Sequence, residues 1–353
     1  MQGRSAAVRL ADVAERAGVS LATASFAMSG RSGVSEKVAE RIRGIAAELG
    51  YVPNLQARAL ASGASSTVGL IVHNIADPYF SEIAAATVRS ANRLGLMVQI
   101  CQSSRDPEHE LRQLRVLVAS RVRAIVIAGS GQSVRSSQAA FYAELKRFQA
   151  TGGRVAVIGR HHVGVDAVLP ENEAGGRSMG AHFVALGHRK IAIASGPRTL
   201  TVMEDRLRGV FDALTAAGIT TKDVPVIEAP FDREGGRLAA EQVLAEHPEV
   251  TGIIALNDAT ATGILATLRA HGISVPSDMS VSGFDDVDVA ADLGPGLTTI
   301  HLPLADMGEA ALALALKEPA ARPRRKVMKH SLVVRGSTAP ARGKHRDGVR
   351  RSG

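Results

Sequence analysis

The spacing of apolar residues near the start of the chain predicts two short helices joined by a tight turn. Small and apolar residues recur there at steps of three and four, as on one face of a helix: Leu10, Val13, Ala14 and Ala17. Gly18 tolerates the left-handed backbone that ends a helix, and Ser20 can cap a second helix from Leu21 to about Met28. Ala24 is small enough to pack between the two. This pattern is typical of a helix-turn-helix, whose second helix enters the major groove of DNA.

A third helix and a shorter fourth one are predicted next. Ser35 can cap the third helix, Gly50 can end it, and its apolar stripe consists of Val38, Ile42, Ile45, Ala46 and Leu49. These helices alone also fit a small bundle with no role in DNA binding. Residues 54–62 predict a helix that starts after Pro53 and ends at Gly63. At about nine residues it is too short to be stable alone in water, so it can fold on DNA and unfold away from it.

Beyond a polar joint at residues 62–66, short apolar runs alternate with helical segments. The predicted strands are Val68–Val72, Met97–Cys101, Ala124–Ala128, Val155–Ile158, Ile191–Ala194, Val226–Ile227, Ile253–Leu256 and Val281–Phe284. The first helices between them run from about Phe80 to Leu94 and across Pro107 to Ala119. Apolar strands that alternate with helices indicate parallel sheets covered on both faces, and two such series predict an α/β body of two Rossmann-like lobes. The chain is expected to cross between the lobes near Val168–Pro170, Gly296–His301 and Lys326–Leu332.

Polar and aromatic residues gather where the predicted strands end. They are Asn74, Asp77, Tyr79, Phe80, Arg160, Arg206, Phe231, Asn257 and Asp285. Ligands of such folds bind at the carboxyl ends of strands, here in a cleft between the lobes. Arg and Asp present donors and acceptors to adjacent hydroxyls and aromatic faces cover a sugar ring, so a polyhydroxyl ligand is expected. Two alternatives stay open: Asp258 and Asp286 can cap the following helices, and Arg206 with Asp285 can be a purely structural ion pair.

Charge is distributed unevenly along the chain, whose formal net charge is +8. Residues 1–66 contain eight Lys and Arg against five Asp and Glu, and residues 320–353 contain eleven against one, which leaves −5 for the middle. A basic head, an acidic body and a basic end indicate that nucleic acid is bound at the ends of the chain. Residues 339–353 are rich in Arg, Lys and Gly and predict a disordered tail, which either only solubilises the protein or adds a weak, salt-sensitive attraction to DNA.

Other classes of protein fit less well. No run of 18 apolar residues is present and no apolar signal segment follows Arg4, so a cytoplasmic protein without a membrane span is expected. Cys101, the single cysteine, lies in an apolar run and is expected to be a buried strand thiol. His161 and His162 lack partners at metal-ligand spacing, which predicts a solvated loop and no metal site. Without a nucleophile elbow, a P-loop or a dinucleotide glycine motif, neither an enzyme nor a cofactor is expected.

Two motifs carry a resemblance to a known family. Residues 9–30 match a pattern that includes Leu-x-Asp-Val-Ala-x-x-Ala-Gly-Val-Ser, and residues 51–60 match Tyr-x-Pro-Asn followed by a hinge helix. From about Val8 to Arg335 the chain resembles the LacI/GalR family of bacterial repressors. The resemblance implies a helix-turn-helix domain over residues 1–52, a hinge helix and linker over 53–66, and a two-lobed body of periplasmic-binding-protein type over 67–338 that binds an effector and dimerises.

The resemblance also implies which residues contact DNA. They are Leu21, Ala22, Thr23, Ser25 and Phe26 in the recognition helix, and Asn54, Ala57, Arg58 and Leu60 in the hinge. Phe26 departs from the Arg of many members, so contact with thymine methyl groups replaces a bidentate contact to guanine, unless Phe26 packs beneath the helix. Leu60 matches a leucine that wedges into the minor groove and kinks the duplex. Arg9 departs from a common Thr, so the first helix cap is expected to be weaker.

Two hinge helices are needed to fill the groove, so the resemblance implies a homodimer on a near-palindromic operator. In the body it aligns Arg206, Asn257 and Asp285 with the family's principal effector contacts, and Phe231 with an aromatic residue that stacks on the effector. Gly159 stands where several sugar-responsive members carry Asp, so the identity of the effector stays open, as does its action as inducer or corepressor. A free sugar-binding protein that feeds a transporter shares the body fold, but the helix-turn-helix argues against it. The expected function is therefore a sequence-specific transcriptional repressor whose operator affinity is controlled by a sugar or a sugar derivative.

Overall fold

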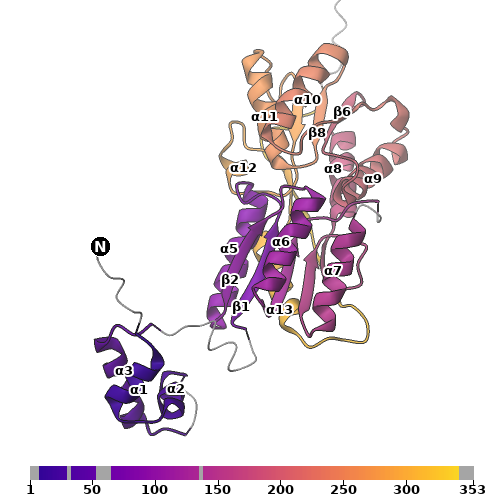
Figure 1. Cartoon of the computed structure of the whole chain (residues 1–353). Coiled ribbons are helices and arrows are strands. Elements are labelled where there is room, and N and C mark those ends of the chain that lie inside the picture. Colours follow the sequence, from indigo (N-terminus) through magenta and orange to yellow (C-terminus); the bar gives the residue numbers. More distant parts are fainter. Residues whose placement is uncertain (1–7, 30–32, 53–64, 135–137, 342–353) are drawn as a thin grey trace, which may run out of the picture. The chain divides into compact units, whose positions relative to one another are not determined.

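The structure is a computed structural model that describes residues 8–29, 33–52, 65–134 and 138–341. It divides into two compact units, Met1–Ser66 and Thr67–Gly353 (Figure 1). Among the described residues, every helix is too short or too polar to cross a lipid bilayer.

The described residues of the first unit form three helices: α1 (Leu10–Ala17), α2 (Leu21–Ser29) and α3 (Glu36–Glu48). Gly18 ends α1 in the left-handed conformation, with φ of 64°, and the Ser20 hydroxyl accepts the Thr23 N–H at 3.1 Å, so both sequence predictions are confirmed. At the start of α1 the Asp12 carboxylate accepts the N–H of Arg9 at 2.7 Å. Ser35 occupies the predicted N-cap position of α3, but its side chain makes no capping bond. The buried residues are mostly small, which lets the helices pack closely: Val13, Ala14, Ala17, Ala24, Ala27, Ala39, Ile42 and Ala46.

The second unit contains two parallel sheets and a short antiparallel pair. The first sheet has the order β11-β5-β4-β3-β1-β2, and its strands are β1 (Thr67–Val72), β2 (Met97–Gln102), β3 (Ala124–Ala128), β4 (Arg154–Ile158), β5 (Asp166–Pro170) and β11 (Arg325–Met328). The second sheet has the order β7-β6-β8-β9, and its strands are β6 (Ile191–Ser195), β7 (Val226–Glu228), β8 (Gly252–Ala255) and β9 (Ser280–Ser282). Strands β10 (Thr299–His301) and β12 (Ser331–Val333) pair with each other. The predicted two-lobed α/β architecture is confirmed.

Helices cover both faces of each sheet. In the first lobe α5 (Pro78–Arg93) and α13 (Leu304–Leu316) contribute to one apolar cluster, whereas α6 (Pro107–Ala119) and α7 (Ala139–Ala150) contribute to the cluster on the other face. In the second lobe α8 (Asn172–Ala185) and α9 (Thr201–Ala216) lie on one face, and α10 (Arg233–Glu246) and α11 (Asp258–Ala270) on the other. A 3-10 turn at Thr221–Asp223 and the short helix α12 (Val289–Asp292) complete the lobe.

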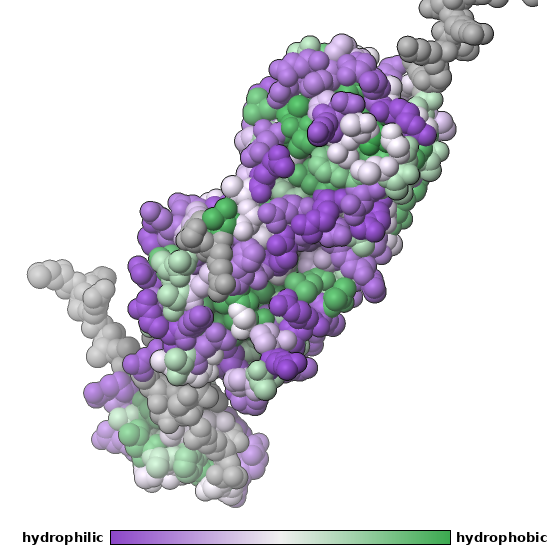
Figure 2. All heavy atoms as spheres, turned by 90° about the vertical axis from the view of Figure 1, so that its right-hand side faces the viewer, coloured by the Kyte–Doolittle hydropathy of each residue, from purple (hydrophilic) through white to green (hydrophobic). Residues whose placement is uncertain are grey.

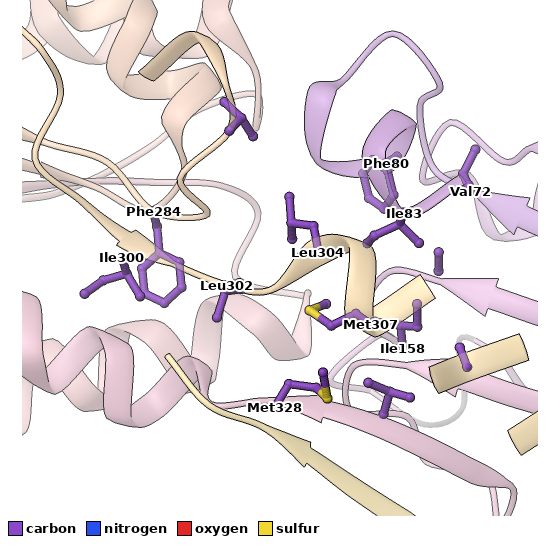
Figure 3. Packing of buried hydrophobic residues seen from close by; sticks show 14 of the residues in the cluster. Val72, Phe80, Ile83, Ile158, Phe284, Ile300, Leu302, Leu304, Met307 and Met328 are labelled. Atoms are coloured by element: carbon purple, nitrogen blue, oxygen red, sulfur yellow. The ribbon is translucent and has the colours of Figure 1, made fainter. Parts of the chain in front are cut away.

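The chain passes between the lobes at the three predicted places: after β5, between β10 and α13, and between β11 and β12. One apolar cluster runs through these crossings. Figure 3 shows Phe284 and Ile300 on the side of the second lobe, Leu302 on the connecting segment, Leu304 at the start of α13, and Phe80 with Ile83 on the side of the first lobe. The lobes therefore share a core beside their hinge.

Two local predictions outside the sites can be compared with the structure. Cys101 is buried, as expected, and burial raises the pKa of its thiol. The disorder predicted from residue 339 is wrong for the first three residues, because Ala339 N–H donates to the Ser280 hydroxyl and Ala341 N–H donates to the Leu186 carbonyl. Residues 342–353 lie outside the described part of the chain.

Charged and polar residues cover much of the face that Figure 2 shows, and hydrophobic residues appear on it as separate patches.

Candidate DNA-binding and ligand-binding sites

Helix α2 presents an exposed face that is largely apolar. Leu21 and Phe26 are 55% and 38% exposed, and Ala22 and Ser25 lie beside them at helical spacing. Ala24 and Ala27, on the opposite face, are buried against α1 and α3. Since Phe26 is exposed, it does not pack beneath the helix, and the face offers apolar contact instead of charge-assisted hydrogen bonds.

Thr23 has a second role at the start of this helix. Its hydroxyl lies 2.8 Å from the Ser20 hydroxyl, whose oxygen also accepts the Thr23 N–H, so the two side chains fix the first turn of α2. The four hinge residues predicted to contact DNA, Asn54, Ala57, Arg58 and Leu60, lie outside the described residues.

A cavity of about 470 Å³, its open mouth included, lies among the carboxyl ends of strands from both lobes. Seven of the nine residues predicted from strand ends line it: Asp77, Tyr79, Phe80, Arg206, Phe231, Asn257 and Asp285. Sequence reasoning missed His73, Arg105, Ser130, Asn172, Leu200 and Val202, which line it as well. Gly159, noted for its departure from the family pattern, is also in the wall, with φ of 96°.

Arg206 is the most fully bonded charged group in the cavity. It is only 2% exposed, its Nε donates to Asn172 Oδ1 at 3.0 Å, Nη1 donates to the Leu256 carbonyl, and Nη2 donates to Asp285 Oδ1 at 2.7 Å. Its guanidinium carbon lies 3.7 Å from the centre of the Phe284 ring. Close packing of α8 on α9 sets this position, because a Cβ at Gly176 would lie 2.3 Å from the Arg206 carbonyl oxygen.

Asp285 is fixed by its backbone as well as by Arg206. Its φ is 113°, unusual for a residue with a side chain, and it is 5% exposed. Burial raises the pKa of Asp285, and the adjacent Arg206 opposes part of that rise. A buried carboxylate held by one guanidinium can accept further hydrogen bonds only from groups inside the cavity, so the pair is suited to bind hydroxyls of a ligand.

Asp258 and Asp286 do not cap the following helices, which was the alternative role left open for them. Asn257 caps α11, because its Oδ1 accepts the Thr260 N–H at 2.8 Å. Asp258 accepts the Val287 N–H and the Thr299 hydroxyl instead, and burial raises its pKa to about 8. Asp286 pairs with Arg335 at 2.7 Å. These contacts hold the loops after β8 and β9 together, beside the cavity.

Two predicted residues do not line the cavity. Asn74 Oδ1 accepts the Ala76 N–H at 3.0 Å and stabilises the turn before α5. Arg160 turns toward the start of α9, where it donates to Glu204 at 2.6 Å and to Asp205 at 2.9 Å. Its carbonyl accepts the Thr201 hydroxyl at 2.8 Å.

Backbone bonds continue this contact between the lobes. Thr201 N–H donates to the Gly131 carbonyl at 2.9 Å, and Ser133 N–H donates to the Thr199 carbonyl at 2.6 Å. We call residues 131–133, 160, 199–201, 204 and 205 the clasp. It joins the first lobe to the residues that immediately precede Arg206.

His161 and His162 do not form the solvated loop that the sequence predicts. Both rings are partly buried, with His161 Nε2 2.6 Å from the Gly129 carbonyl and His162 Nε2 3.2 Å from the Ser133 carbonyl. Burial lowers the pKa of His161 to about 4, so its imidazole is neutral. The described residues contain no group of three His, Cys, Asp or Glu side chains able to hold a metal ion.

Comparison with known proteins agrees with both units. Residues 9–54 match the model of bacterial regulatory proteins of the lacI family, and residues 181–338 match a periplasmic binding protein-like domain. The chain is 30% identical to the HTH-type transcriptional regulator DegA of Bacillus subtilis over 93% of this chain and 97% of DegA. It is 32% identical to the regulator GalR of Salmonella typhimurium over 87% of this chain and 90% of GalR.

Among solved structures, the lac repressor dimer bound to operator and an anti-inducer is 28% identical, with a TM-score of 0.83 over 94% of this chain and 99% of that one. The complex of the regulator CelR with cellobiose is 27% identical, with a TM-score of 0.69 over 94% and 99% of the two chains. The chain belongs to the LacI/GalR family of DNA-binding transcriptional repressors, whose affinity for DNA is controlled by a small molecule.

Proposed function

We propose that this repressor is a homodimer without catalytic activity, that it binds a near-palindromic operator, and that a polyhydroxyl ligand in the cavity changes its affinity for that operator. The observation that carries the proposal is the buried Arg206–Asp285 pair, placed where the strands of both lobes end. A ligand held by this pair and by residues of the first lobe binds most tightly in one arrangement of the two lobes.

On the DNA side, the exposed face of α2 is the surface that enters the major groove. Leu21, Ala22 and Phe26 offer apolar contact to thymine methyl groups, and Ser25 offers one hydroxyl. Direct readout by this face is therefore weak for guanine. Arg58 and Leu60 are proposed to supply a phosphate contact and the minor-groove wedge, which read the flexibility of the central base step.

The edge of the first sheet supports dimerisation. Strand β2 is the last strand on one side of that sheet, and it exposes Met97 and Ile100 by 50% and 41%. Leu94, in the turn that precedes β2, is also exposed. An exposed apolar sheet edge is a liability in a monomer and is stabilised when a second subunit covers it.

The clasp offers a route from the cavity to the rest of the body. Thr201, Glu204 and Asp205 contact the first lobe from the same helix that positions Arg206. A ligand bound by Arg206 and Asp285 therefore acts on the helix that holds the lobes together. Coupling of about 1–3 kcal/mol, which is about 5- to 150-fold in operator affinity, is ordinary for such proteins.

In vitro selection from random 30-bp duplexes tests the proposal. The full chain is expected to enrich a two-fold symmetric site, and Leu60→Ala is expected to lose affinity for that site while retaining the non-specific affinity of the wild type. Enrichment of a single asymmetric half-site, by a protein that sediments as a monomer, would contradict the proposed dimer. A Leu60→Ala variant with wild-type affinity for the selected site would contradict the wedge.

A further inference from the structure

One end of the cavity holds an arginine that hydrogen-bonds to none of the described residues. The Arg105 guanidinium carbon lies 5.9 Å from the centre of the Phe80 ring and 5.3 Å from that of Phe231, so it sits between an aromatic ring of each lobe. The side chain is 23% exposed. Its Nη2 is 3.9 Å from Asp77 Oδ2, which is beyond hydrogen-bond distance. A largely buried guanidinium with unused donors is uncommon, because its N–H groups are costly to remove from water.

A second polar side chain, His73, lies at the same end. His73 is 7% exposed, and its Nδ1 lies 2.8 Å from the Ser103 hydroxyl. Its Nε2 is buried against Gly129, where a Cβ would lie 2.4 Å from it, so this atom does not face the open part of the cavity. The ring meets Phe80 edge to face, with 5.4 Å between the ring centres. His73 and Arg105 therefore approach the cavity around the same phenylalanine.

The backbone that carries Arg105 is strained. Ser104 and Arg105 have φ of 56° and 59°, two consecutive residues with side chains in the left-handed region. Such a conformation persists only when its surroundings hold it, and it is most often found where a binding site requires it. Here the Ser104 N–H donates to the His73 carbonyl, and Asp106 caps α6 by accepting the Glu108 N–H. The turn thus fixes the direction of Arg105 into the cavity wall.

The two arginines of the cavity differ in what they leave free. Arg206 uses all three of its nitrogens on Asn172, Leu256 and Asp285, whereas Arg105 uses none on the described residues. A free guanidinium fork matches the two oxygens of a carboxylate or phosphate. Asp77 lies beyond hydrogen-bond distance of Arg105, and burial raises the pKa of its carboxyl.

From this geometry we infer that the ligand is an acidic sugar derivative, whose carboxylate or phosphate is bound by Arg105, while Arg206 and Asp285 bind its hydroxyls. The inference rests on the proposed function of the cavity as the effector site.

Thermal unfolding of the full chain with matched pairs of probes tests the inference. The pairs are gluconate with glucitol, glucuronate with glucose, and ribose 5-phosphate with ribose; the first two test a carboxylate and the third a phosphate. Each pair is measured on the wild type, on Arg105→Gln and on Arg121→Gln, with dissociation constants from calorimetry for every probe that raises the Tm. Arg121 is the matched control because it is also an arginine with positive φ, of 53°, but it is exposed and outside the cavity.

At least one acidic probe is expected to bind the wild type and Arg121→Gln at least tenfold more tightly than its neutral partner, and to lose that advantage in Arg105→Gln. Equal binding of the neutral and acidic members, or an undiminished preference in Arg105→Gln, would overturn the inference. So would a panel in which nothing binds; selection of a symmetric operator by the same preparation would then leave the proposed repressor intact. If Arg105→Gln does not fold, Arg105→Lys and the wild type decide the question, since a lysine keeps the charge but loses the bidentate fork.

Discussion

The two surfaces proposed to contact ligands are built in opposite ways. The exposed face of α2 carries Leu21, Ala22, Ser25 and Phe26, and none of these side chains is charged. The cavity of the body instead buries Asp77, Arg105, Arg206 and Asp285 together. An apolar face contains no charge that must be compensated when a groove covers it, whereas buried charges demand particular partners.

The two surfaces therefore discriminate between ligands by different physical effects. On α2, contact with methyl groups and with the shape of the duplex discriminates by small increments, so a site must be long and symmetric to be selective. In the cavity, a wrong ligand leaves a buried charge or donor without a partner, and that penalty alone is large. Four substitutions test how buried charges and exposed faces contribute to stability and binding.

The largest expected effect is that of Asp285→Asn. Removing one partner of a buried ion pair leaves the Arg206 charge uncompensated, so the free energy of unfolding should fall by about 3–5 kcal/mol. Asp212→Asn is the matched control, because Arg177 and Asp212 also lie 2.7 Å apart but are about half exposed. That variant should lose no more than about 1 kcal/mol. Urea unfolding measures both, and equal losses would show that burial does not distinguish the two pairs.

Glu110→Gln tests a buried charge that is outside the cavity. Glu110 is 4% exposed, accepts one hydrogen bond from Gln138 at 2.9 Å, and burial raises its pKa to about 7. Since the folded carboxyl keeps its proton above its ordinary pKa of 4.5, it stabilises the fold at low pH, and this contribution is lost as pH rises toward 7.

Between pH 5 and 8 the loss from Glu110 should be about 2 kcal/mol, and Glu110→Gln should remove it, so that the variant is more stable than the wild type at pH 8. Glu108→Gln, on the same helix but 89% exposed at its side chain, should leave the pH dependence unchanged. Unfolding free energies at the two pH values provide the measurement. If the free energy of unfolding of Glu110→Gln depended on pH as strongly as that of the wild type, Glu110 would have to be ionised in the folded protein.

Arg160→Gln should loosen the clasp without unfolding the lobes. The side chain is about one-third exposed, so its loss should cost about 1–2 kcal/mol, seen as roughly 5- to 30-fold faster hydrogen exchange in residues 131–133 and 199–201. Arg177→Gln, which removes ion pairs within the second lobe only, should leave those amides unchanged. Unchanged exchange in Arg160→Gln would show that the backbone bonds hold the lobes by themselves.

The smallest effect is expected for Phe26→Ala. Loss of apolar contact in the major groove should weaken binding to the selected operator by about 1 kcal/mol, or about fivefold, with no change in non-specific affinity. Ala47→Gln, an uncharged change at an exposed position of α3, should leave operator affinity unchanged. Fluorescence anisotropy with labelled duplexes distinguishes them, and an unchanged Phe26→Ala would remove Phe26 from the DNA contact.

The sequence was a good guide wherever structure is determined locally. Strand β3 and helix α6 have their predicted bounds, because apolar runs and turn residues mark both ends. Strand β9 ends at Ser282, two residues before the predicted end, where the chain approaches the positive-φ Asp285. Such a backbone reversal at a residue with a side chain leaves no signal in the sequence.

The candidate site was predictable only in part, for the same reason. Strand ends identified Asn257 and Asp285, and the start of a helix identified Arg206. Arg105 was missed because a left-handed turn three residues beyond β2 brings it into the cavity. Arg160 also follows a strand, but Glu204 and Asp205 attract it from more than 40 residues away. Pairing of charges over that distance depends on the packed fold and cannot be read from spacing.

The most direct test of the account is the affinity of the full chain for its selected operator, measured by anisotropy with and without the probe that most raises its Tm. A change of about 5- to 150-fold is expected in the Kd of the wild type, and none in that of Asp285→Asn. A wild-type Kd that stays the same while the probe saturates the cavity would contradict the account, because ligand binding would then be uncoupled from DNA.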